Sequence, residues 1–379
     1  MRHYLDWAST ALPYETTRDL TFYANPSSSH SEGRAAKEAL EKSRERCAKV
    51  LGVKAEQLYF TSGGTESNSL VLHSLLLKKG SSQLLYSGIE HPSVRENCLR
   101  LKRLGLPTGE IGVEGSGQVT ESTLRKALEK HKDTRFVAVM GVNNETGSLM
   151  DIKSLVSAAR KTQSENGPSI HFHCDLVQAL GKTPVDISAW DIDSGAFSAH
   201  KLGGSRGVGL LYLKKPIEAL YAGGEQEGRI RPGTENVHGA VELASLLEKR
   251  ANAETVKAEA EKAQTRLDYF IAGLKKINRA SIIPEDRNEA DKRFSPWIIQ
   301  IRIKDLPAMV MVRALDDMGI AVSTGSACSS SSPERPVLAA MGVKASSRLE
   351  GLRISQGWST ELVDFDALLS GIEKALLSL

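Results

Sequence analysis

A lysine at the end of a β-rich run has the surroundings that most directly indicate chemistry. The run Phe197–Lys201 is followed by the glycine-rich stretch Gly203–Gly207. Lys201 can form a Schiff base with an aldehyde cofactor there, while the hydroxyl of Ser198 and the imidazole of His200 bind a phosphate group on that cofactor. Alone, the segment also fits an exposed lysine in a loop, which is the commoner situation. The interpretation therefore depends on other residues.

A carboxylate and an amide follow another apolar run of the chain. Asp175 ends the run Ile170–Cys174, and Gln178 lies close behind it. A pyridoxal cofactor needs a carboxylate on its pyridinium nitrogen, because holding that proton keeps the ring an electron sink. Asp175 fits this role, and Gln178 can reach the phenolic oxygen of the ring.

The same segment also contains residue types that bind metal ions, namely His171, His173, Cys174 and Asp175. Successive side chains of a strand point to opposite faces, so His171 and His173 would share a face and Cys174 would point away. A metal site needs three or four converging ligands. The pattern therefore favours the cofactor interpretation, and no metal is predicted.

A phosphate cradle is predicted in the segment Thr61–Asn68, which connects a strand to a helix. Glycines such as Gly64 let the backbone approach an anion, N–H groups at the helix N-terminus point toward it, and Thr65 adds a hydroxyl. A tight turn followed by a capped helix explains the same residues. The phosphate interpretation therefore rests on the neighbouring motifs.

Two further polar segments follow strand-like runs. His91 can stack on a cofactor ring and move protons. Either Asn143 or Asn144 can hydrogen-bond the ring oxygen. Both segments also fit ordinary turns. Their joint occurrence at successive strand ends indicates one site, because ligands of open α/β sheets bind at the carboxyl ends of the strands.

Cys328 lies in a stretch of small and polar residues, Ser323–Pro333, which predicts a mobile loop rather than a core element. A thiol on such a loop can enter a pocket, act as a thiolate and carry a product out, although an inert loop cysteine is the alternative. The other cysteines are far apart in the sequence and fit small buried hydrophobic residues, so no disulfide framework is expected: Cys47, Cys98 and Cys174.

Arg353 is the predicted anchor for a substrate carboxylate. It lies in the short segment Leu352–Ser355. A guanidinium group can hold a carboxylate through two parallel hydrogen bonds. A surface ion pair is the alternative explanation for this residue.

The elements that must position these residues alternate between β-rich runs and helical stretches from about Tyr59 to Leu213, a pattern typical of a sheet covered by helices on both faces. Most connections are long enough for crossovers, so the sheet is predicted to be mainly parallel. The predicted strands are Leu58–Thr61, Gln83–Ser87, Phe136–Val142, Ile170–Cys174, Ser194–Ser198 and Gly207–Leu213. The predicted helices between them include Glu66–Lys79, Thr120–His131 and Ile152–Ser164.

The flanking regions predict further helices and a second unit. An amphipathic helix is expected from about Glu32 to Leu51, and a long helix from about His238 to Leu274. Residues from about 280 onward are typical of a compact α+β unit. We predict an α/β protein with a large domain over residues 12–255. The smaller α+β domain covers residues 256–379 together with residues 1–11.

The composition excludes several classes of protein. The chain has 379 residues, of which 40% are hydrophobic and 25% charged, as in globular proteins. A net charge of +3 gives no electrostatic footprint for nucleic acid or an anionic bilayer. No apolar run is long enough for a membrane span, and Met1 leads directly into a strand-like segment. A cytoplasmic location is expected.

Together these motifs resemble the cysteine desulfurases, class V aminotransferases with the aspartate-aminotransferase-like fold. The resemblance runs nearly from end to end, in the family order. Its segments are Tyr4–Asp6 with Ala8 and Thr10, Asn25–Ser28 with His30, Thr61–Asn68, Glu90-His91, Asn143–Gly147, Asp175 with Gln178, Ser198–Lys201, Arg231–Asn236 and Gly325–Ser329.

The resemblance implies pyridoxal 5'-phosphate as the cofactor, with Lys201 as its Schiff-base lysine. Asp175 and Gln178 would contact the ring, and His91 would stack on it. Thr234 looks like the residue that reaches the phosphate of the other subunit, so a homodimer is implied. The implied set around the phosphate is Gly64, Thr65, Ser198, His200 and Thr234.

The implied reaction converts L-cysteine to L-alanine and leaves the sulfur on Cys328 as a persulfide. Arg353 and Asn144 would bind the substrate, and His91 would move protons. The implied sulfur acceptor is an iron–sulfur scaffold, a tRNA-thiolating enzyme or another protein. The alternatives are a selenocysteine lyase or another lyase of this fold, and a catalytically silent sulfur-relay subunit, which has no need for Lys201 and its surrounding residues.

Overall fold

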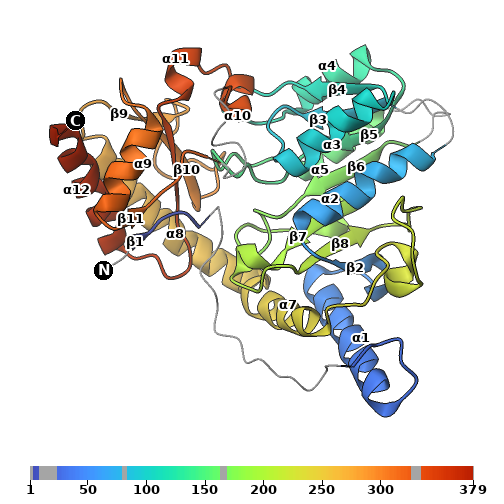
Figure 1. Ribbon diagram of the computed structural model, residues 1–379. Helices are drawn as coiled ribbons and strands as arrows, with labels where there is room; N and C mark the ends of the chain where they lie inside the picture. Colours follow the sequence, from blue (N-terminus) through green and yellow to red (C-terminus); the bar gives the residue numbers. More distant parts are fainter. Residues whose placement is uncertain (1–2, 8–23, 79–82, 163–168, 326–333, 379) are drawn as a thin grey trace.

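The computed structural model describes residues 3–7, 24–78, 83–162, 169–325 and 334–378. These residues form a large sheet with its covering helices and, beside it, a smaller sheet with its own helices (Figure 1). Cys328 lies outside the described residues, as do Ala8 and Thr10. In the described ranges, no helix is both long enough and apolar enough to cross a bilayer.

The large sheet has seven strands in the order β2-β8-β7-β6-β5-β3-β4. All neighbouring pairs are parallel except the two made by β8, which runs against β2 and β7. The prediction of a mainly parallel sheet is confirmed. The strands are β2 Leu58–Thr61, β3 Gln83–Ser87, β4 Thr108–Ile111, β5 Thr134–Ala138, β6 His171–Asp175, β7 Ser194–Ser198 and β8 Gly209–Leu213.

Both faces of this sheet are buried because successive residues of its strands face opposite layers. In β3, Leu84 packs into one hydrophobic cluster and Leu85 into another. One face is covered by α2 (Gly64–His73) and α3 (Pro92–Arg103). The helices that bury the other face are α1 Ser31–Leu51, α4 Glu121–Lys130, α5 Ile152–Thr162, α6 Ile187–Trp190 and α7 Val237–Arg250.

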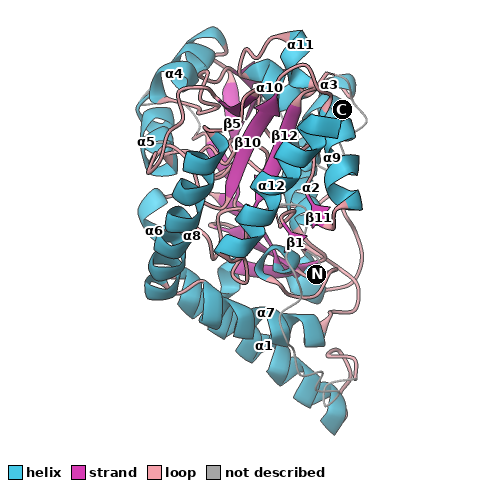
Figure 2. Cartoon of the chain, turned by 90° about the vertical axis from the view of Figure 1, so that its left-hand side faces the viewer, coloured by secondary structure: helices cyan, strands magenta, loops and turns pink. Residues whose placement is uncertain are grey.

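A second core surrounds the small antiparallel sheet, in which β10 lies between β9 and β12. Figure 2 shows α8, α9 and α12 around β10 and β12. The N-terminal residues join this part of the chain, because β1 pairs in parallel with β11. The elements are β1 His3–Tyr4, α8 Ala253–Leu274, β9 Ala280–Ile283, β10 Ile298–Ile303, α9 Ala308–Asp317, β11 Ile320–Ala321, α10 Pro336–Ala340, α11 Ala345–Arg348, β12 Gly351–Ser355 and α12 Leu362–Ser378.

Most predicted elements exist, but several of their boundaries were wrong. The single helix predicted from His238 to Leu274 is two helices, α7 and α8, because the side chain of Asn252 accepts a hydrogen bond from Thr255 N–H at 2.9 Å and starts α8 anew. The strand predicted over Phe136–Val142 is shorter, and β4 was not among the predicted strands. The domain boundary between residues 255 and 256 stays a prediction.

Gly209 of β8 lies directly against Gly63, the residue before α2. A Cβ atom on Gly209 would lie 2.4 Å from Gly63 Cα and 2.7 Å from Gly63 N. We expect Gly209→Ala to lower the free energy of unfolding by about 1–3 kcal/mol, because the backbone of Gly63 would have to move away from β8. Urea denaturation measures this change. Gly112→Ala is the control, since its Cβ would meet no atom within 4 Å; an equal loss in both variants would contradict the argument.

Candidate active site

The sheet brings the predicted residues to one edge. Asp175 ends β6, and Ser198 ends its parallel neighbour β7. Lys201 lies in the 3-10 turn η4 (Ala199–Leu202) that directly follows β7. Gly64 begins α2 soon after β2, and His91 is the N-cap of α3 soon after β3. Because β2, β3, β6 and β7 run in the same direction, these residues meet at the carboxyl edge of the sheet.

The lowered pKa of Lys201 favours nucleophilic attack by its amine. Burial lowers the pKa of Lys201 to about 7, and the positive charges of Lys182 and Arg353 act in the same direction. Asp6 and Asp175 oppose this change. A large fraction of the amine is therefore unprotonated near neutral pH, which is the form that attacks an aldehyde.

Asp175 is buried and receives hydrogen bonds from both sides. One carboxylate oxygen accepts from Asn68 Nδ2 at 2.8 Å, and the other accepts from the backbone N–H of Val177 at 3.0 Å. Only 5% of Asp175 is exposed. These donors fix the carboxylate so that it can hold a positively charged ring nitrogen at the mouth of the site.

His91 is held by the first turn of α3. Its Nδ1 atom accepts a hydrogen bond from Ser93 N–H at 3.1 Å and lies 2.8 Å from Ser93 Oγ. Burial lowers the pKa of His91, an effect that Asp175 opposes and that Lys201 and Arg353 reinforce. A neutral imidazole that can accept a proton results.

The predicted phosphate cradle is tightly built. Gly63 has a φ of 149°, and a Cβ on Gly64 would lie 2.5 Å from Val177 Cγ2, so both positions favour glycine. Thr65 is exposed at the start of α2. Burial lowers the pKa of His200 to about 4, so this imidazole is neutral.

Two other predicted cofactor contacts differ in their exposure to solvent. Gln178 is 4% exposed, and its Oε1 accepts a hydrogen bond from Lys182 Nζ at 3.2 Å. Thr234 is exposed in the segment that precedes α7. Its role across a dimer interface stays a prediction.

The structure separates the roles of the two neighbouring asparagines. Asn143 is fully buried: its Nδ2 donates to Ile89 O at 3.0 Å, and its Oδ1 accepts from the N–H groups of Glu145 and Thr146 at 2.9 Å each. These bonds shape the loop. The carbonyl of Asn144 accepts from Arg353 Nη1 at 2.9 Å, which places Asn144 beside the predicted substrate anchor. Asn144 is therefore the better candidate for a cofactor or substrate contact.

Arg353 is buried between the two cores and is only 1% exposed. Besides Asn144, it contacts Asp6, whose Oδ1 accepts from Nη2 at 2.7 Å. Among the described residues, its Nε atom has no hydrogen-bond partner. A buried guanidinium with an unused donor suits a further anionic group, so Arg353 fits a substrate carboxylate that shares or replaces Asp6.

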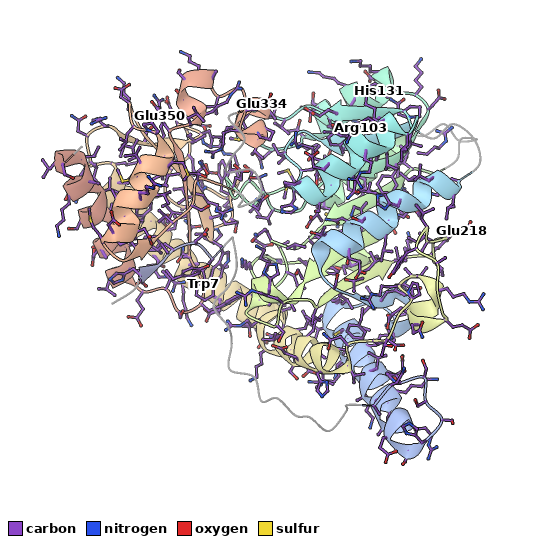
Figure 3. The ribbon with its side chains drawn as sticks, in the orientation of Figure 1. Trp7, Arg103, His131, Glu218, Glu334 and Glu350 are labelled. Atoms are coloured by element: carbon purple, nitrogen blue, oxygen red, sulfur yellow. The ribbon has the colours of Figure 1, made fainter. Side chains whose placement is uncertain are left out.

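The segment that contains Cys328 has both of its described ends beside this site. Ser323 pairs with Arg353 through the backbone, and Thr324 O accepts a hydrogen bond from the buried Arg335 side chain. Glu334, where the described chain resumes, lies between the two halves of the molecule (Figure 3). The position of Cys328 itself stays a prediction.

The remaining cysteines are confirmed as buried residues without exposed thiols. Cys47, Cys98 and Cys174 are each 0% exposed. Burial raises the pKa of Cys47 to about 12 and also raises the pKa values of the other two thiols. None of these three forms a reactive thiolate near neutral pH.

Two buried ionisable residues near the site had no role in the sequence-based prediction. Lys182 is 1% exposed, and burial lowers its pKa to about 7. Glu90 is 3% exposed, and burial raises its pKa to about 8. Both lie next to residues that the motifs did identify, Gln178 and His91, but a sequence alone does not reveal which polar neighbours are buried.

Replacement of Lys182 tests the electrostatic argument for Lys201. We expect Lys182→Met to raise the pKa of Lys201 by up to about one unit, because a nearby positive charge is removed. The pH dependence of the rate at which the apo-protein forms a Schiff base with pyridoxal phosphate measures this shift. Lys215→Met, on an exposed residue, is the control. A midpoint that stays in place or moves to lower pH would show that Lys182 does not act on Lys201.

Glu90 makes stability depend on pH. Its folded pKa of about 8 lies above the ordinary value of 4.5, so its contribution to stability is present below about 4.5 and is lost as the pH rises toward 8. We expect the stability of Glu90→Gln relative to wild type to increase across this range, by up to about 1.4 kcal/mol per pH unit. Denaturant titrations at several pH values measure it, with the exposed Glu96→Gln as control. A difference independent of pH would refute the assignment.

Comparisons with known proteins identify the family of this chain. The family model described as aminotransferase class-V matches residues 3–368. A cysteine desulfurase IscS of Dictyoglomus turgidum is 35% identical over 98% of this chain and 94% of its own length. A cysteine desulfurase IscS of Methanosarcina thermophila is 33% identical over 97% of this chain and 88% of its own.

Solved structures give the same result. A NifS-like protein superposes with a TM-score of 0.89 and 30% identity, covering 100% of both chains. A structure titled SspA in complex with cysteine has a TM-score of 0.77 and 26% identity, covering 93% of this chain and 98% of its own. The family resemblance and the fold expected from it are confirmed. The chain belongs to the class-V aminotransferase family.

Proposed function

We propose that this protein is a pyridoxal-phosphate-dependent cysteine desulfurase, which converts L-cysteine to L-alanine and keeps the sulfur as a persulfide on Cys328. The observation that carries the proposal is the half-buried Lys201, with a pKa of about 7, at the same carboxyl edge of the sheet as Asp175. Relatives named cysteine desulfurase and a structural neighbour with bound cysteine support the choice of substrate.

The residues of the site fit the cofactor. Asp175, fixed by Asn68 and Val177, would hold the ring nitrogen, and His91 would stack on the ring. When bound, the cofactor supplies an electron sink that acidifies the Cα–H bond of the substrate and weakens its Cβ–S bond. The other proposed contacts are Gln178 and Asn144 with the ring, and Gly64, Thr65, Ser198, His200 and a partner subunit's Thr234 with the phosphate.

The chain's own residues account for substrate binding and proton movement. Arg353, whose Nε has no hydrogen-bond partner among the described residues, would bind the carboxylate of cysteine. Lys201, once released, would take the Cα proton, because its lowered pKa favours the unprotonated amine. His91 would take the thiol proton of Cys328, since its own ring is neutral and accessible to the site.

The sulfur transfer needs no external oxidant, because the electrons of the bond that breaks stay on the carbon product. The Sγ of Cys328 attacks the sulfur of the substrate, an S–S bond forms and the Cβ–S bond breaks. The electron pair of the broken bond stays on carbon, which takes a proton and becomes the methyl group of alanine. One thiol and one cysteine therefore give one persulfide and one alanine.

Further parts of the proposal concern the setting of the enzyme. We propose a cytoplasmic homodimer, in which Thr234 reaches the neighbouring site. The persulfide would pass to a sulfur-acceptor protein such as an iron–sulfur scaffold, with no nucleic acid or membrane as direct partner. The near-neutral charge balance of the chain agrees with these exclusions.

Replacement of Cys328 tests the persulfide step. With L-cysteine supplied, we expect wild type to form alanine and to gain one sulfur atom on the Cys328 peptide, as seen by mass spectrometry. Cys328→Ala should keep the visible band of the bound cofactor but lose at least about a hundredfold in alanine formation, because it lacks the nucleophile. Cys98→Ala is the matched control, since that thiol is buried on α3. A fully active Cys328→Ala would instead indicate a direct lyase, such as a selenocysteine lyase.

A further inference from the structure

Polar residues occupy one entire face of β6, the central strand that ends at Asp175. His171, His173 and Asp175 alternate along the strand, while Phe172 and Cys174 pack into the hydrophobic cluster on the other side. Alternate residues of a strand share a face. This face therefore presents three polar side chains in a row to the layer that contains α2.

A continuous chain of hydrogen bonds connects these residues. His171 Nε2 lies 2.7 Å from Ser194 Oγ, which lies 2.8 Å from His173 Nδ1. His173 Nε2 lies 2.9 Å from Asn68 Oδ1, and Asn68 Nδ2 donates to Asp175 Oδ2 at 2.8 Å. These hydrogen bonds thus connect the first residue of β6 to its last residue, through side chains of β7 and α2.

The direction of every hydrogen bond in this chain is determined. Asn68 must turn its NH₂ group toward the carboxylate of Asp175, so its oxygen faces His173 and requires a proton on His173 Nε2. Burial lowers the pKa of His173 to about 3, so the ring is neutral and its Nδ1 accepts the proton of Ser194. Ser194 Oγ must then accept a hydrogen bond from His171 Nε2. Burial also lowers the pKa of His171, so that this ring is neutral as well.

Asn68 has a second branch that reaches His91. Its NH₂ group also donates to Ser93 Oγ at 2.8 Å, so the hydroxyl proton of Ser93 is available for His91 Nδ1 at 2.8 Å. The backbone N–H of Ser93 points at the same nitrogen. His91 Nδ1 therefore carries no proton, and in the neutral ring the proton lies on Nε2. Asn68 and His173 are both 0% exposed, so no bulk water competes for these bonds.

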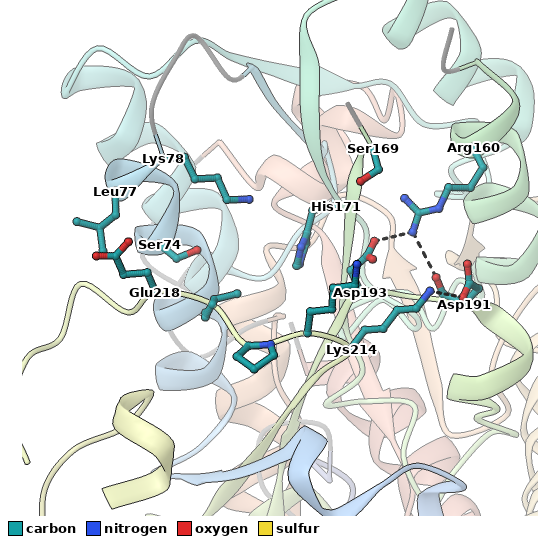
Figure 4. Close-up of a pocket in the computed structure, with 13 residues that line it drawn as sticks. Ser74, Leu77, Lys78, Arg160, Ser169, His171, Asp191, Asp193, Lys214 and Glu218 are labelled. Atoms are coloured by element: carbon teal, nitrogen blue, oxygen red, sulfur yellow. Dashed lines mark hydrogen bonds and ion pairs between the residues drawn. The ribbon is translucent and has the colours of Figure 1, made fainter. Parts of the chain in front are cut away.

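The outer end of this series of hydrogen bonds, at His171, lies at a cavity of about 510 Å³ on the opposite edge of the sheet (Figure 4). His171 lines this cavity and stacks on Phe136 with ring centroids 4.9 Å apart. On the cavity wall, Arg160 and Asp193 pair at 2.6 Å. The inner members of this hydrogen-bonded row, Ser194, His173 and Asn68, are each 0% exposed, whereas His171 at its outer end is half-buried.

We infer that Asn68 is a positioning residue that orients Asp175 against the cofactor ring nitrogen and, through Ser93, sets the tautomer of His91. The line of His171, Ser194 and His173 holds the Asn68 amide in the required orientation. The inference rests on the proposed function for the identity of the cofactor. The directions of the hydrogen bonds do not depend on it.

The tautomers can be measured in the wild-type apo-protein. Nitrogen-15 NMR of histidine-labelled protein near neutral pH should show neutral His91, His171 and His173 rings, each protonated on Nε2. Single histidine variants assign the signals. In Asn68→Ala, His173 should lose its fixed tautomer. In His171→Phe, where the new ring can still stack on Phe136, His173 should retain its tautomer. His173 protonated on Nδ1 in wild type would overturn the inference.

Cofactor affinity provides the second readout. We expect Asn68→Ala to bind pyridoxal phosphate roughly tenfold to a hundredfold more weakly than wild type, because Asp175 loses a charge-assisted hydrogen bond. Asn97→Ala is the matched control: Asn97 lies on α3 and donates to Ser69 Oγ and Ser93 O but does not contact Asp175. Equal affinity in Asn68→Ala and Asn97→Ala would refute the positioning role. If wild type itself bound no cofactor, the proposed function would fail, a result distinct from equal affinities.

Discussion

A buried carboxylate must receive hydrogen bonds or lose its charge, and Asp175 at the active site is subject to this constraint. Its donors come from Val177 in its own turn and from Asn68 on α2. Asn68 reaches β6 only because α2 starts close to the sheet, where Gly63 and Gly209 are in backbone contact. The glycines at the start of α2 thus form part of the predicted phosphate cradle and also allow Asn68 to orient Asp175.

The charges around Lys201 follow from the same burial. Lys182 and Arg353 oppose its protonation, while Asp6 and Asp175 favour it. Arg353 and Asp6 come from the half of the molecule built on the small sheet, and Asp175 and Lys182 from the half built on the large one. The site therefore depends on the contact between the two cores, such as the hydrogen bond from Trp297 Nε1 to Lys182 O at 2.8 Å.

Much of this site follows from local sequence patterns. Short apolar runs predicted the strands, and the rule that ligands bind at carboxyl ends of parallel strands brought Asp175, Ser198 and Lys201 together. The patterns included Asn68 in the segment Thr61–Asn68 but could not reveal its action on a residue 107 positions away. They also joined α7 to α8, because the helical period continues across Asn252. Burial and long-range partners, not residue type, decide such roles. The role of Cys328 was predicted from its small, polar neighbours and rests on the experiment above.

The proposed function depends most on which amine binds the cofactor, since the half-buried Lys201 and the buried Lys182 both have pKa values of about 7. Reduction of the protein with borohydride after addition of pyridoxal phosphate, followed by peptide mapping, identifies the modified lysine. We expect a single pyridoxyl group on the peptide that contains Lys201. A label on Lys182, or no stable label at all, would contradict it.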